Sequence, residues 1–351
     1  MDIFIYPGFF EIKINIMGEI NMRFKKIAAL AATAVLTVGI FAGCGGASQQ
    51  TSSSNSSSKK KVIGFAQVGA ESGWRTAETS SIKEIPKLNP NFELKFSDGQ
   101  QKQENQIKAI RSFIAEKVDI IALDPVVETG WDTVLREAKN AKIPVVIVDR
   151  NVKVADNSLV TAFLGSDMEE EGKRAAKIVI NKFGKDAKLN IAELQGTVGS
   201  TAMIGRQKGF NETIKDCPNY KIIKSQTGDF TRAKGKEVME AFLKSDGNKI
   251  NVLWSHNDDM AVGAIQAIEE YGKKPGKDIF IVSVDGIKDM FKLMADGKSN
   301  GIVECNPLLG PQLVETSKQV LSGKLKDKIV HTKEGVFTQD QAKKELPNRK
   351  Y

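Results

Sequence analysis

The stretch IPVVIVDRNV, residues 143–152, joins an apolar run directly to an acid and a base. A chain that buries such a run usually ends it with a turn residue, whereas here Asp149 and Arg150 follow Val148 at once. A carboxylate accepts hydrogen bonds and a guanidinium donates them in a planar fork, so the pair could hold one polar ligand from two directions. The competing interpretation is an ion pair on the protein surface.

Polar side chains also follow other apolar runs of the sequence. In chain order they are Glu71 and Arg75, then Asp124, Asn257 and Asp285. In open parallel sheets, ligands bind outside the carboxyl ends of the strands. The recurrence of these groups at one topological position therefore predicts a ligand site, and it favours a binding role for Asp149 and Arg150 over a surface ion pair.

A sugar matches the chemistry of these groups, because its hydroxyls both donate and accept hydrogen bonds while Asp accepts them and Arg and Asn donate them. Trp74 could cover the apolar face of a sugar ring, although core packing would also explain it. Asn257 precedes the helical stretch DDMAVGAIQAIEE, so it could cap a helix, contact the ligand, or do both. Hydrogen bonds to charged partners contribute roughly 1.5–3 kcal/mol each, so several could support the roughly −8 kcal/mol of a micromolar complex.

Short β-rich runs alternate with helical patterns from Val62 onward. The predicted strands are Val62–Gln67, Phe92–Ser97, Asp119–Leu123, Pro144–Val148, Thr161–Leu164, Leu189–Leu194, Tyr220–Ser225, Ile250–Trp254, Ile279–Val284 and Gly301–Val303. Between two of them, QENQIKAIRSFIAEK has apolar residues at i, i+3 and i+4 spacing: Ile107, Ile110, Phe113 and Ile114.

Continuously apolar strands separated by helices predict an α/β fold with parallel sheets covered on both faces. Ten or so strands are more than one doubly wound sheet comfortably holds. We therefore expect two sheets of about five or six strands, with a break in the pattern near Gly165–Asp167.

The composition is that of a globular protein of about two domains, with 351 residues, 41% hydrophobic and 27% charged. The formal net charge of +8 is spread without a basic cluster, so we expect no nucleic-acid partner. Cys44, Cys217 and Cys305 have no CxxC spacing and there are only two histidines, so we expect no metal site and no cofactor.

Residues 22–46, MRFKKIAALAATAVLTVGIFAGCGG, have the form of an export signal. Arg23, Lys25 and Lys26 precede an apolar stretch of signal-peptide length, which is short for a membrane span of about 20 residues. The stretch ends in FAGC, which resembles the lipobox of bacterial lipoproteins. That resemblance implies cleavage before Cys44 and a lipid on its sulfur, whereas the alternative is a single-pass helix with an incidental cysteine.

We therefore predict a signal peptide within residues 1–43, and we expect that the residues before Met22 come from a wrongly chosen upstream start codon. Residues 44–61 are predicted to be the lipidated cysteine and a Ser-rich linker, which is too polar to offset its ordering entropy. Such a tether would hold the globular body on the extracytoplasmic face of the cell membrane.

The body from Val62 onward resembles the periplasmic sugar-binding proteins of ABC importers, in the ribose/galactose group. The motifs that carry this resemblance are VGAESGWRTAE, DGQQKQENQIKAIRSF, PVVIVDR, ELQGTVGSTAMIGRQKGF, GDFTRAKGKEVMEAF and HNDDMAVGAIQAI. In the ribose-binding relatives the stretch matching Glu71–Arg75 carries Asn and two Phe, so ESGWR departs from them and fits the galactofuranose branch.

The resemblance implies a type I periplasmic-binding fold, in which two Rossmann-like lobes with parallel sheets are joined by a three-strand hinge. It implies lobes of residues 62–165 with 306–333 and of residues 166–305 with 334–351, and crossings near Gly165–Asp167, Cys305–Pro307 and Thr332–Glu334. It further implies a monomer without enzymatic activity that delivers a monosaccharide to an ABC transporter permease. The implied ligand contacts are Glu71, Ser72, Gly73, Trp74, Arg75, Asp149, Arg150, Arg206, Phe230, Asn257 and Asp285.

Cys305, followed by Asn306, stands where ribose binders place a Gln, so the contact at this point differs from theirs. The simplest interpretation of Cys305 is a small buried apolar residue.

Other functions are compatible with parts of the sequence. A sugar-responsive repressor would need a helix-turn-helix before the body, and residues 1–61 contain a signal and a linker instead. An enzyme could use Glu71 and Asp149 as acid and base, but the chain has no nucleophile elbow, P-loop or metal spacing. A lipoprotein that presents a sugar to a chemoreceptor or sensor kinase would have the same binding chemistry.

Overall fold

The computed structural model of the protein describes residues 59–351. The predicted signal peptide, Cys44 and most of the predicted linker lie outside the described residues. Among residues 59–351, no helix has both the length and the apolar character that crossing a bilayer requires.

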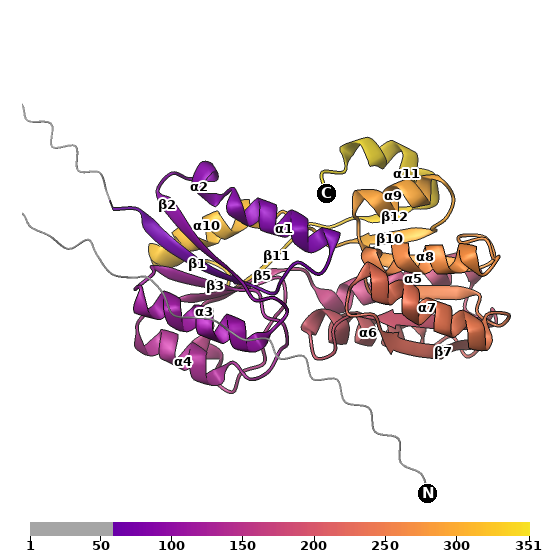
Figure 1. Ribbon diagram of the computed structural model, residues 1–351, viewed down its shortest axis with the longest axis horizontal. Helices are drawn as coiled ribbons and strands as arrows, with labels where there is room; N and C mark the ends of the chain where they lie inside the picture. Colours follow the sequence, from indigo (N-terminus) through magenta and orange to yellow (C-terminus); the bar gives the residue numbers. More distant parts are fainter. Residues whose placement is uncertain (1–58) are drawn as a thin grey trace, which may run out of the picture. The chain divides into compact units, whose positions relative to one another are not determined.

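The first of two six-stranded sheets is parallel throughout and has the order β11-β5-β4-β3-β1-β2 (Figure 1). All four residues of each of the strands β3, β4 and β5 are buried, as the continuous apolar runs predict. The strands are β1 (Lys61–Gln67), β2 (Phe92–Asp98), β3 (Ile120–Leu123), β4 (Val145–Val148), β5 (Ala162–Gly165) and β11 (Ile329–His331).

The second sheet has the order β12-β10-β9-β8-β6-β7, and only the edge strand β12 runs antiparallel to its neighbour. Its strands are β6 (Leu189–Gln195), β7 (Tyr220–Thr227), β8 (Val252–Ser255), β9 (Phe280–Asp285), β10 (Gly301–Glu304) and β12 (Val336–Thr338). All ten predicted strands are present, with ends that differ by at most two residues.

The chain passes between the two sheets three times, after β5, after β10 and after β11. The strands on either side of the third crossing, β11 and β12, were not among the predicted runs, because each has only three residues and none is fully buried. The architecture is the two-lobed, three-crossing fold that the resemblance implied. The residue numbers at which one lobe gives way to the other stay a prediction.

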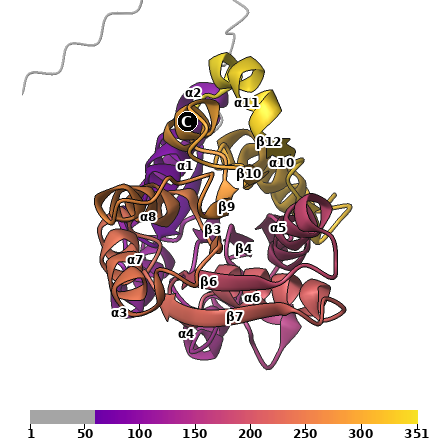
Figure 2. The same ribbon diagram turned by 90° about the vertical axis from the view of Figure 1, so that its right-hand side faces the viewer.

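Helices cover the faces of both sheets. The helices around the first sheet are α1 (Gly73–Lys83), α2 (Ile85–Leu88), α3 (Gln103–Ala115), α4 (Asp132–Asn140) and α10 (Gly310–Leu321), with the short 3₁₀ turn η1 (Asn157–Leu159). Those around the second are α5 (Met168–Phe183), α6 (Thr201–Ile214), α7 (Arg232–Asp246), α8 (Asp258–Glu270), α9 (Lys288–Ala295) and α11 (Gln339–Glu345), with η2 (Leu346–Asn348). In the second set, α5 packs against α6 and α7 against α8, on opposite sides of the sheet (Figure 2).

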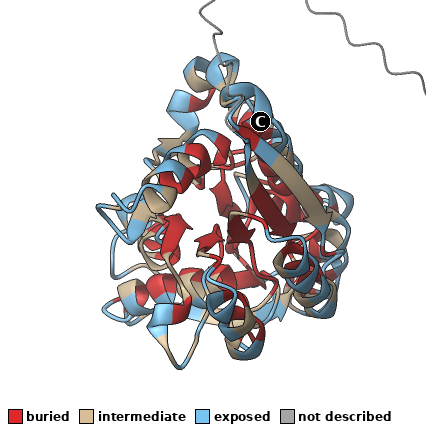
Figure 3. Ribbon diagram, turned by 90° about the vertical axis from the view of Figure 1, so that its left-hand side faces the viewer, coloured by how far each residue is buried: buried red, intermediate tan, exposed pale blue. Residues whose placement is uncertain are grey.

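The buried apolar side chains form one cluster on each face of the first sheet and a larger one around the second sheet. The strands lie in these cores while the outer faces of the helices are exposed (Figure 3). One member of the second-sheet cluster comes from elsewhere in the fold, because Trp74 belongs to α1. The first turn of α1 is therefore packed against the other sheet.

Candidate functional site

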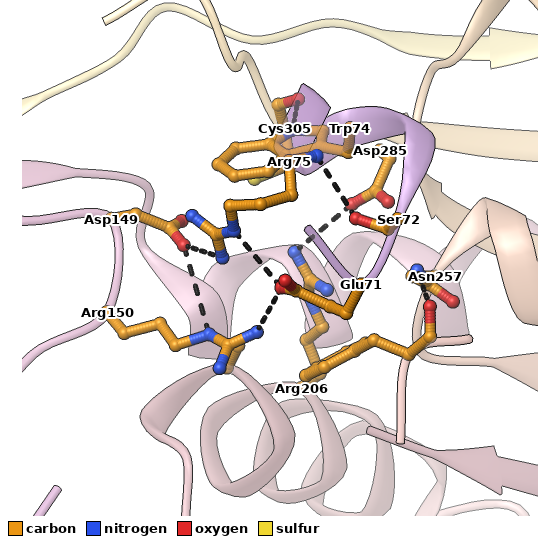
Figure 4. A pocket seen from close by; sticks show the side chains of 12 residues that line it. Glu71, Ser72, Trp74, Arg75, Asp149, Arg150, Arg206, Asn257, Asp285 and Cys305 are labelled. Atoms are coloured by element: carbon orange, nitrogen blue, oxygen red, sulfur yellow. Dashed lines mark hydrogen bonds and ion pairs between the residues drawn. The ribbon is translucent and has the colours of Figure 1, made fainter. Parts of the chain in front are cut away.

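Residues at the carboxyl ends of strands of both sheets, and in the loops and helices that follow these strands, line one cavity (Figure 4). Ten of the eleven predicted contact residues line it, and Gly73 is the one that does not. The open space between the side chains is about 20 Å³, roughly the room for one water molecule. A larger ligand therefore needs the side chains or the two lobes to move apart. The lining residues are Glu71, Ser72, Trp74, Arg75, Asp149, Arg150, Ala202, Arg206, Phe230, Asn257, Asp285 and Cys305.

Arg75, in the first turn of α1, is the centre of a buried charge network. Four carboxylates contact its guanidinium: Glu71 at 3.0 Å, Glu78 at 2.6 Å, Asp124 at 2.5 Å and Asp149 at 2.8 Å. Burial opposes the charge on Arg75, but the four acids outweigh it and raise the pKa of the guanidinium. The side chain is thus fixed, charged, at the edge of the cavity.

The acids of this network exceed its bases. Burial raises the pKa of Asp124 well above its usual range, and it also raises the pKa of Glu78, because Arg75 offsets only part of the cost of burying both charges. Glu71 differs, since Arg75 and Arg150 together outweigh burial and lower the pKa of its carboxyl. Glu71 is therefore the ionised acid that bridges the two arginines.

Arg150 and Asp149 do not form a surface ion pair, because both are buried, with 3% and 4% of their surface exposed. Arg150 Nε lies 3.9 Å from Asp149 Oδ2, its Nη2 donates to Glu71 Oε1 at 3.1 Å, and its guanidinium lies 5.0 Å from the ring centre of Phe230. Asp149 adopts a left-handed backbone conformation, with φ of +59°, at the end of β4. In the turn that follows this strand, the Asp149 side chain contacts Arg75 and the Arg150 side chain lines the cavity.

Arg206 is the corresponding base of the second sheet's half. Its Nε lies 2.8 Å from Glu171, its Nη1 donates to the carbonyl oxygen of His256 at 2.7 Å, and its Nη2 lies 3.6 Å from Asp285. Burial raises the pKa of Asp285 well above its usual range, and Arg206 offsets part of that rise. Glu171 was not predicted as part of the site, since α5 carries three consecutive acids and nothing marks which one turns inward.

Asn257 caps α8 and lines the cavity as well, so the cap interpretation is confirmed. Its Oδ1 accepts from the Met260 backbone N–H at 3.0 Å, and its Nδ2 donates to the Phe230 carbonyl at 3.1 Å. Trp74 likewise combines core packing with a place in the cavity wall, because its ring packs in the second-sheet cluster and lines the cavity. Its indole N–H donates to the Cys305 carbonyl at 2.7 Å.

The residues around Cys305 belong to the three crossings between the sheets. One oxygen of Glu334, within the third crossing, accepts hydrogen bonds from Ser166, Thr332 and the Asn306 backbone N–H. Burial, with the nearby Glu171 charge, raises the pKa of Glu334 to about 7. This carboxyl therefore ties all three hinge segments together.

Three potential metal ligands, from Glu171, Cys305 and Glu334, lie within 4.8 Å of one another at this hinge. Glu171 is already paired with Arg206, and burial raises the pKa of the Cys305 thiol well above its usual range. Metal binding requires the Cys305 thiolate, whereas the raised pKa favours the protonated thiol. The three groups therefore suit a hinge with protonated side chains better than a metal centre. Cys305 is buried, as expected for a small apolar residue, and its sulfur lies 3.3 Å from Ser166 Oγ.

Glu78 is the other member of the charge network that sequence reasoning missed. It lies three residues after Arg75, on the same face of α1, and this spacing is the signal that could have revealed it. Its carboxylate also accepts from the side chain of Gln67 at 3.0 Å, at the end of β1.

Comparison with known proteins gives one family and several close relatives. The periplasmic binding protein domain matches residues 63–325. The galactofuranose-binding protein YtfQ of Escherichia coli (strain K12) is 50% identical over 292 residues, which cover 82% of this chain and 91% of that protein.

Two solved structures share the fold over most of the chain. One is the periplasmic binding protein component of the arabinose ABC transporter from Shewanella sp. ANA-3, bound to α- and β-L-arabinofuranose. It is 54% identical with a TM-score of 0.79, covering 83% of this chain and 96% of that one. The other is a Mycobacterium smegmatis protein in complex with β-D-fucofuranose, 52% identical with a TM-score of 0.80, covering 83% and 95%.

Proposed function

The chain belongs to the periplasmic binding protein family, and we propose that it captures a monosaccharide between its two lobes and delivers it to an ABC transporter permease. The observation that carries this proposal is the cavity, to which each sheet contributes guanidinium, carboxylate and aromatic or indole groups. Such groups match the alternating donors and acceptors of a polyol ring.

The proposed contacts are the residues that line this cavity, with Arg150 and Asp149 on one side and Arg206, Asn257 and Asp285 on the other. Neither set surrounds a ring alone. A sugar that touches both sets stabilises the closed form through contacts that the open form lacks, which is the thermodynamic basis of hinge closure. The lobes proposed to close are residues 62–165 with 306–333 and residues 166–305 with 334–351.

We propose a five-membered ring form, galactofuranose or a related furanose, as the ligand. Two considerations support it. The ESGWR stretch departs from the ribose-binding pattern, and of the three proteins described above one is named for galactofuranose and two are in structures with bound arabinofuranose or fucofuranose. The guanidinium groups of Arg150 and Arg206 lie 5.0 and 5.9 Å from the ring centre of Phe230, so they occupy part of its aromatic face. A ligand must therefore share this wall with the two guanidinium groups.

Titration of the purified protein with free D-galactose, L-arabinose, D-fucose and D-ribose by calorimetry tests the proposal. We expect the first three to bind with a dissociation constant in the micromolar range or below, and ribose to bind more weakly. Galactose labelled with ¹³C at C1 then identifies the bound ring, because the anomeric carbon of a furanose resonates apart from that of a pyranose. Absence of binding by every sugar tested would refute the proposal, whereas a bound pyranose signal would refute only the ring form.

We also propose that a lipid on Cys44 anchors the protein, with residues 45–61 as the tether. The supporting observation is the order of a basic segment, an apolar segment and FAGC directly before a Ser-rich stretch. Cys44→Ser should move the protein from the membrane fraction to the soluble extracytoplasmic fraction without changing sugar affinity. Retention of this variant in the membrane fraction would contradict lipidation.

Presentation of the sugar to a chemoreceptor or sensor kinase is the second candidate function, since it uses the same closed form. Sugar uptake in cells that lack the neighbouring permease genes separates the two. Loss of uptake supports transport, and unchanged uptake with a lost tactic or transcriptional response supports sensing.

A further inference from the structure

Gly73, the predicted contact residue that does not line the cavity, contacts the other lobe instead. Its backbone N–H donates to Asp259 Oδ2 at 2.7 Å, across 186 residues of sequence. Gly73 begins α1, beside the first sheet, whereas Asp259 lies in the first turn of α8, beside the second. The bond thus joins the two lobes at a point outside the cavity lining.

The first turn of α1 is attached in two directions. Gly73 and Trp74 bond to elements of the second sheet, through Asp259 and the Cys305 carbonyl, while Arg75 turns back to the acids of the first sheet. Ser72 caps the same turn by accepting from the Arg75 backbone N–H at 3.0 Å. A contact that fixes Gly73 therefore also helps to position Trp74 and Arg75 relative to the second lobe.

Asp259 is held for this contact by Arg232 of α7. The Arg232 guanidinium donates to Asp259 Oδ1 through Nη2 at 2.9 Å and through Nε at 3.2 Å, which leaves Oδ2 for Gly73. Asp259 is buried, with 4% of its surface exposed, while its partner Arg232 is half-exposed. The Arg232 Nη2 also reaches the exposed Asp289, at 3.3 Å.

The small size of Gly73 leaves room for this contact. A Cβ on Gly73 would lie 3.3 Å from Asp259 Oδ2, tighter than ordinary van der Waals contact, and 3.9 Å from Ile287. In addition, the N–H of the first residue of a helix has no acceptor within the helix. Asp259 supplies the missing acceptor, and it does so from the opposite lobe.

From this geometry we propose that Asp259, oriented by Arg232, is an interlobe latch that positions the first turn of α1 and so raises sugar affinity without touching the sugar. The effect on affinity rests on the proposed function. The latch itself does not, because its donor and acceptor both belong to the protein. Asp259 is on this account a positioning residue, and it acts through Trp74 and Arg75.

Amide hydrogen exchange at Gly73 reports the latch directly, since no other acceptor protects this N–H. We expect exchange about tenfold faster in Asp259→Ala than in the wild-type protein, with and without saturating D-galactose. Asp289→Ala is the matched control, because it removes the other acid on Arg232 but leaves the bond to Gly73. Its Gly73 exchange should equal that of the wild type.

Calorimetric titration with D-galactose then measures the consequence. Asp259→Ala should raise the dissociation constant about three- to tenfold, Asp289→Ala less than twofold, and Asp259→Asn, which retains one acceptor oxygen, by an intermediate factor.

A second variant covers the case in which Asp259→Ala fails to fold. Arg232→Met removes the guanidinium that orients Asp259 and leaves both Gly73 and the Asp259 carboxylate in place. Exchange at Gly73 should be faster in this variant than in the wild type, by a smaller factor than in Asp259→Ala. The Arg232→Met/Asp259→Ala double variant should bind galactose no more weakly than the weaker single variant, because Arg232 acts through Asp259.

Equal Gly73 exchange rates in the wild type, Asp259→Ala and Asp289→Ala would overturn the latch, and so would additive losses of affinity in the double variant. Failure of the proposed function has a different signature, namely no heat of binding in the wild-type titration while the exchange rates still differ.

Discussion

The two halves of the cavity hold the side chains that line it by different means. On the first-sheet side, ion pairs fix the charged side chains, since Arg75 contacts four carboxylates and Glu71 bridges Arg75 to Arg150. On the second-sheet side, hydrogen bonds to the backbone fix several of these side chains. Arg206 donates to the His256 carbonyl oxygen, and Asn257 caps α8 and donates to the Phe230 carbonyl oxygen.

This difference has an energetic consequence. A buried charge that loses its partner costs several kcal/mol, whereas a cap or a single hydrogen bond contributes about 1 kcal/mol. The first half should therefore combine binding with stability, so that its residues are hard to exchange. The second half should tolerate substitutions that change affinity alone, which makes it the better place to alter sugar preference.

Arg75→Met should give the largest effect, because it leaves fully buried Glu78 and Asp124 without their cation. We expect a loss of about 3–5 kcal/mol in the free energy of unfolding, measured by urea denaturation. Arg206→Met is the counterpart in the second half and should cost less, since only Glu171 loses a close ionic partner. Equal losses in the two variants would break the comparison between the halves.

The hinge between the halves should give the protein a measurable pH dependence. The pKa of Glu334 is 4.5 for the ordinary group and about 7 in the fold, so the folded protein binds this proton more tightly than the unfolded chain. The resulting stability is fully present below about pH 4.5 and is lost as the pH rises through 7, with a total of about 3 kcal/mol.

Glu334→Gln should remove that part of the pH dependence in urea denaturation between pH 5 and 8. Glu315→Gln, which changes an exposed acid of α10, should leave the profile as it is in the wild type. A Glu334→Gln profile that matches the wild-type profile would contradict this assignment and would place the pH sensitivity on other buried acids, such as Asp258, whose pKa burial also raises to about 7.

Trp74→Phe should give the smallest effect. It removes only the indole N–H that donates to the Cys305 carbonyl and keeps a ring in the second-sheet cluster. We expect a loss of about 1 kcal/mol in unfolding free energy and a few-fold weaker binding of D-galactose. A loss as large as that of Arg75→Met would show that the first turn of α1 depends on the second lobe more than on its own charge network.

The sequence predicts the strands well because each central strand is buried on both faces, as in β3 and β4, so that its apolar run is unbroken. The same logic failed for β11 and β12, whose three residues are partly exposed at the sheet edges. A strand can be predicted from the sequence only when enough consecutive residues are buried to give a recognisable run of apolar residues.

For the candidate site, the rule that ligands gather at the carboxyl ends of strands predicts Asp149, Arg150 and Asp285 together, and the structure places all three in the lining of one cavity. The rule could not reveal that Arg75 faces the acids of its own sheet, or that Gly73 faces Asp259, because both depend on the rotation of α1 and on the approach of the second lobe. Glu171 was missed for the same reason, since side-chain direction on α5 is set by its packing against α6.

Calorimetric titration of D-galactose into the wild type, Arg150→Ala and Asp285→Ala tests most directly whether one sugar is held from both halves. If it is, each substitution weakens binding by at least about 1.5 kcal/mol, more than tenfold in the dissociation constant, while the folded state persists in circular dichroism. Titration curves for both variants that coincide with the wild-type curve would contradict the account, because they would place the sugar somewhere other than this cavity.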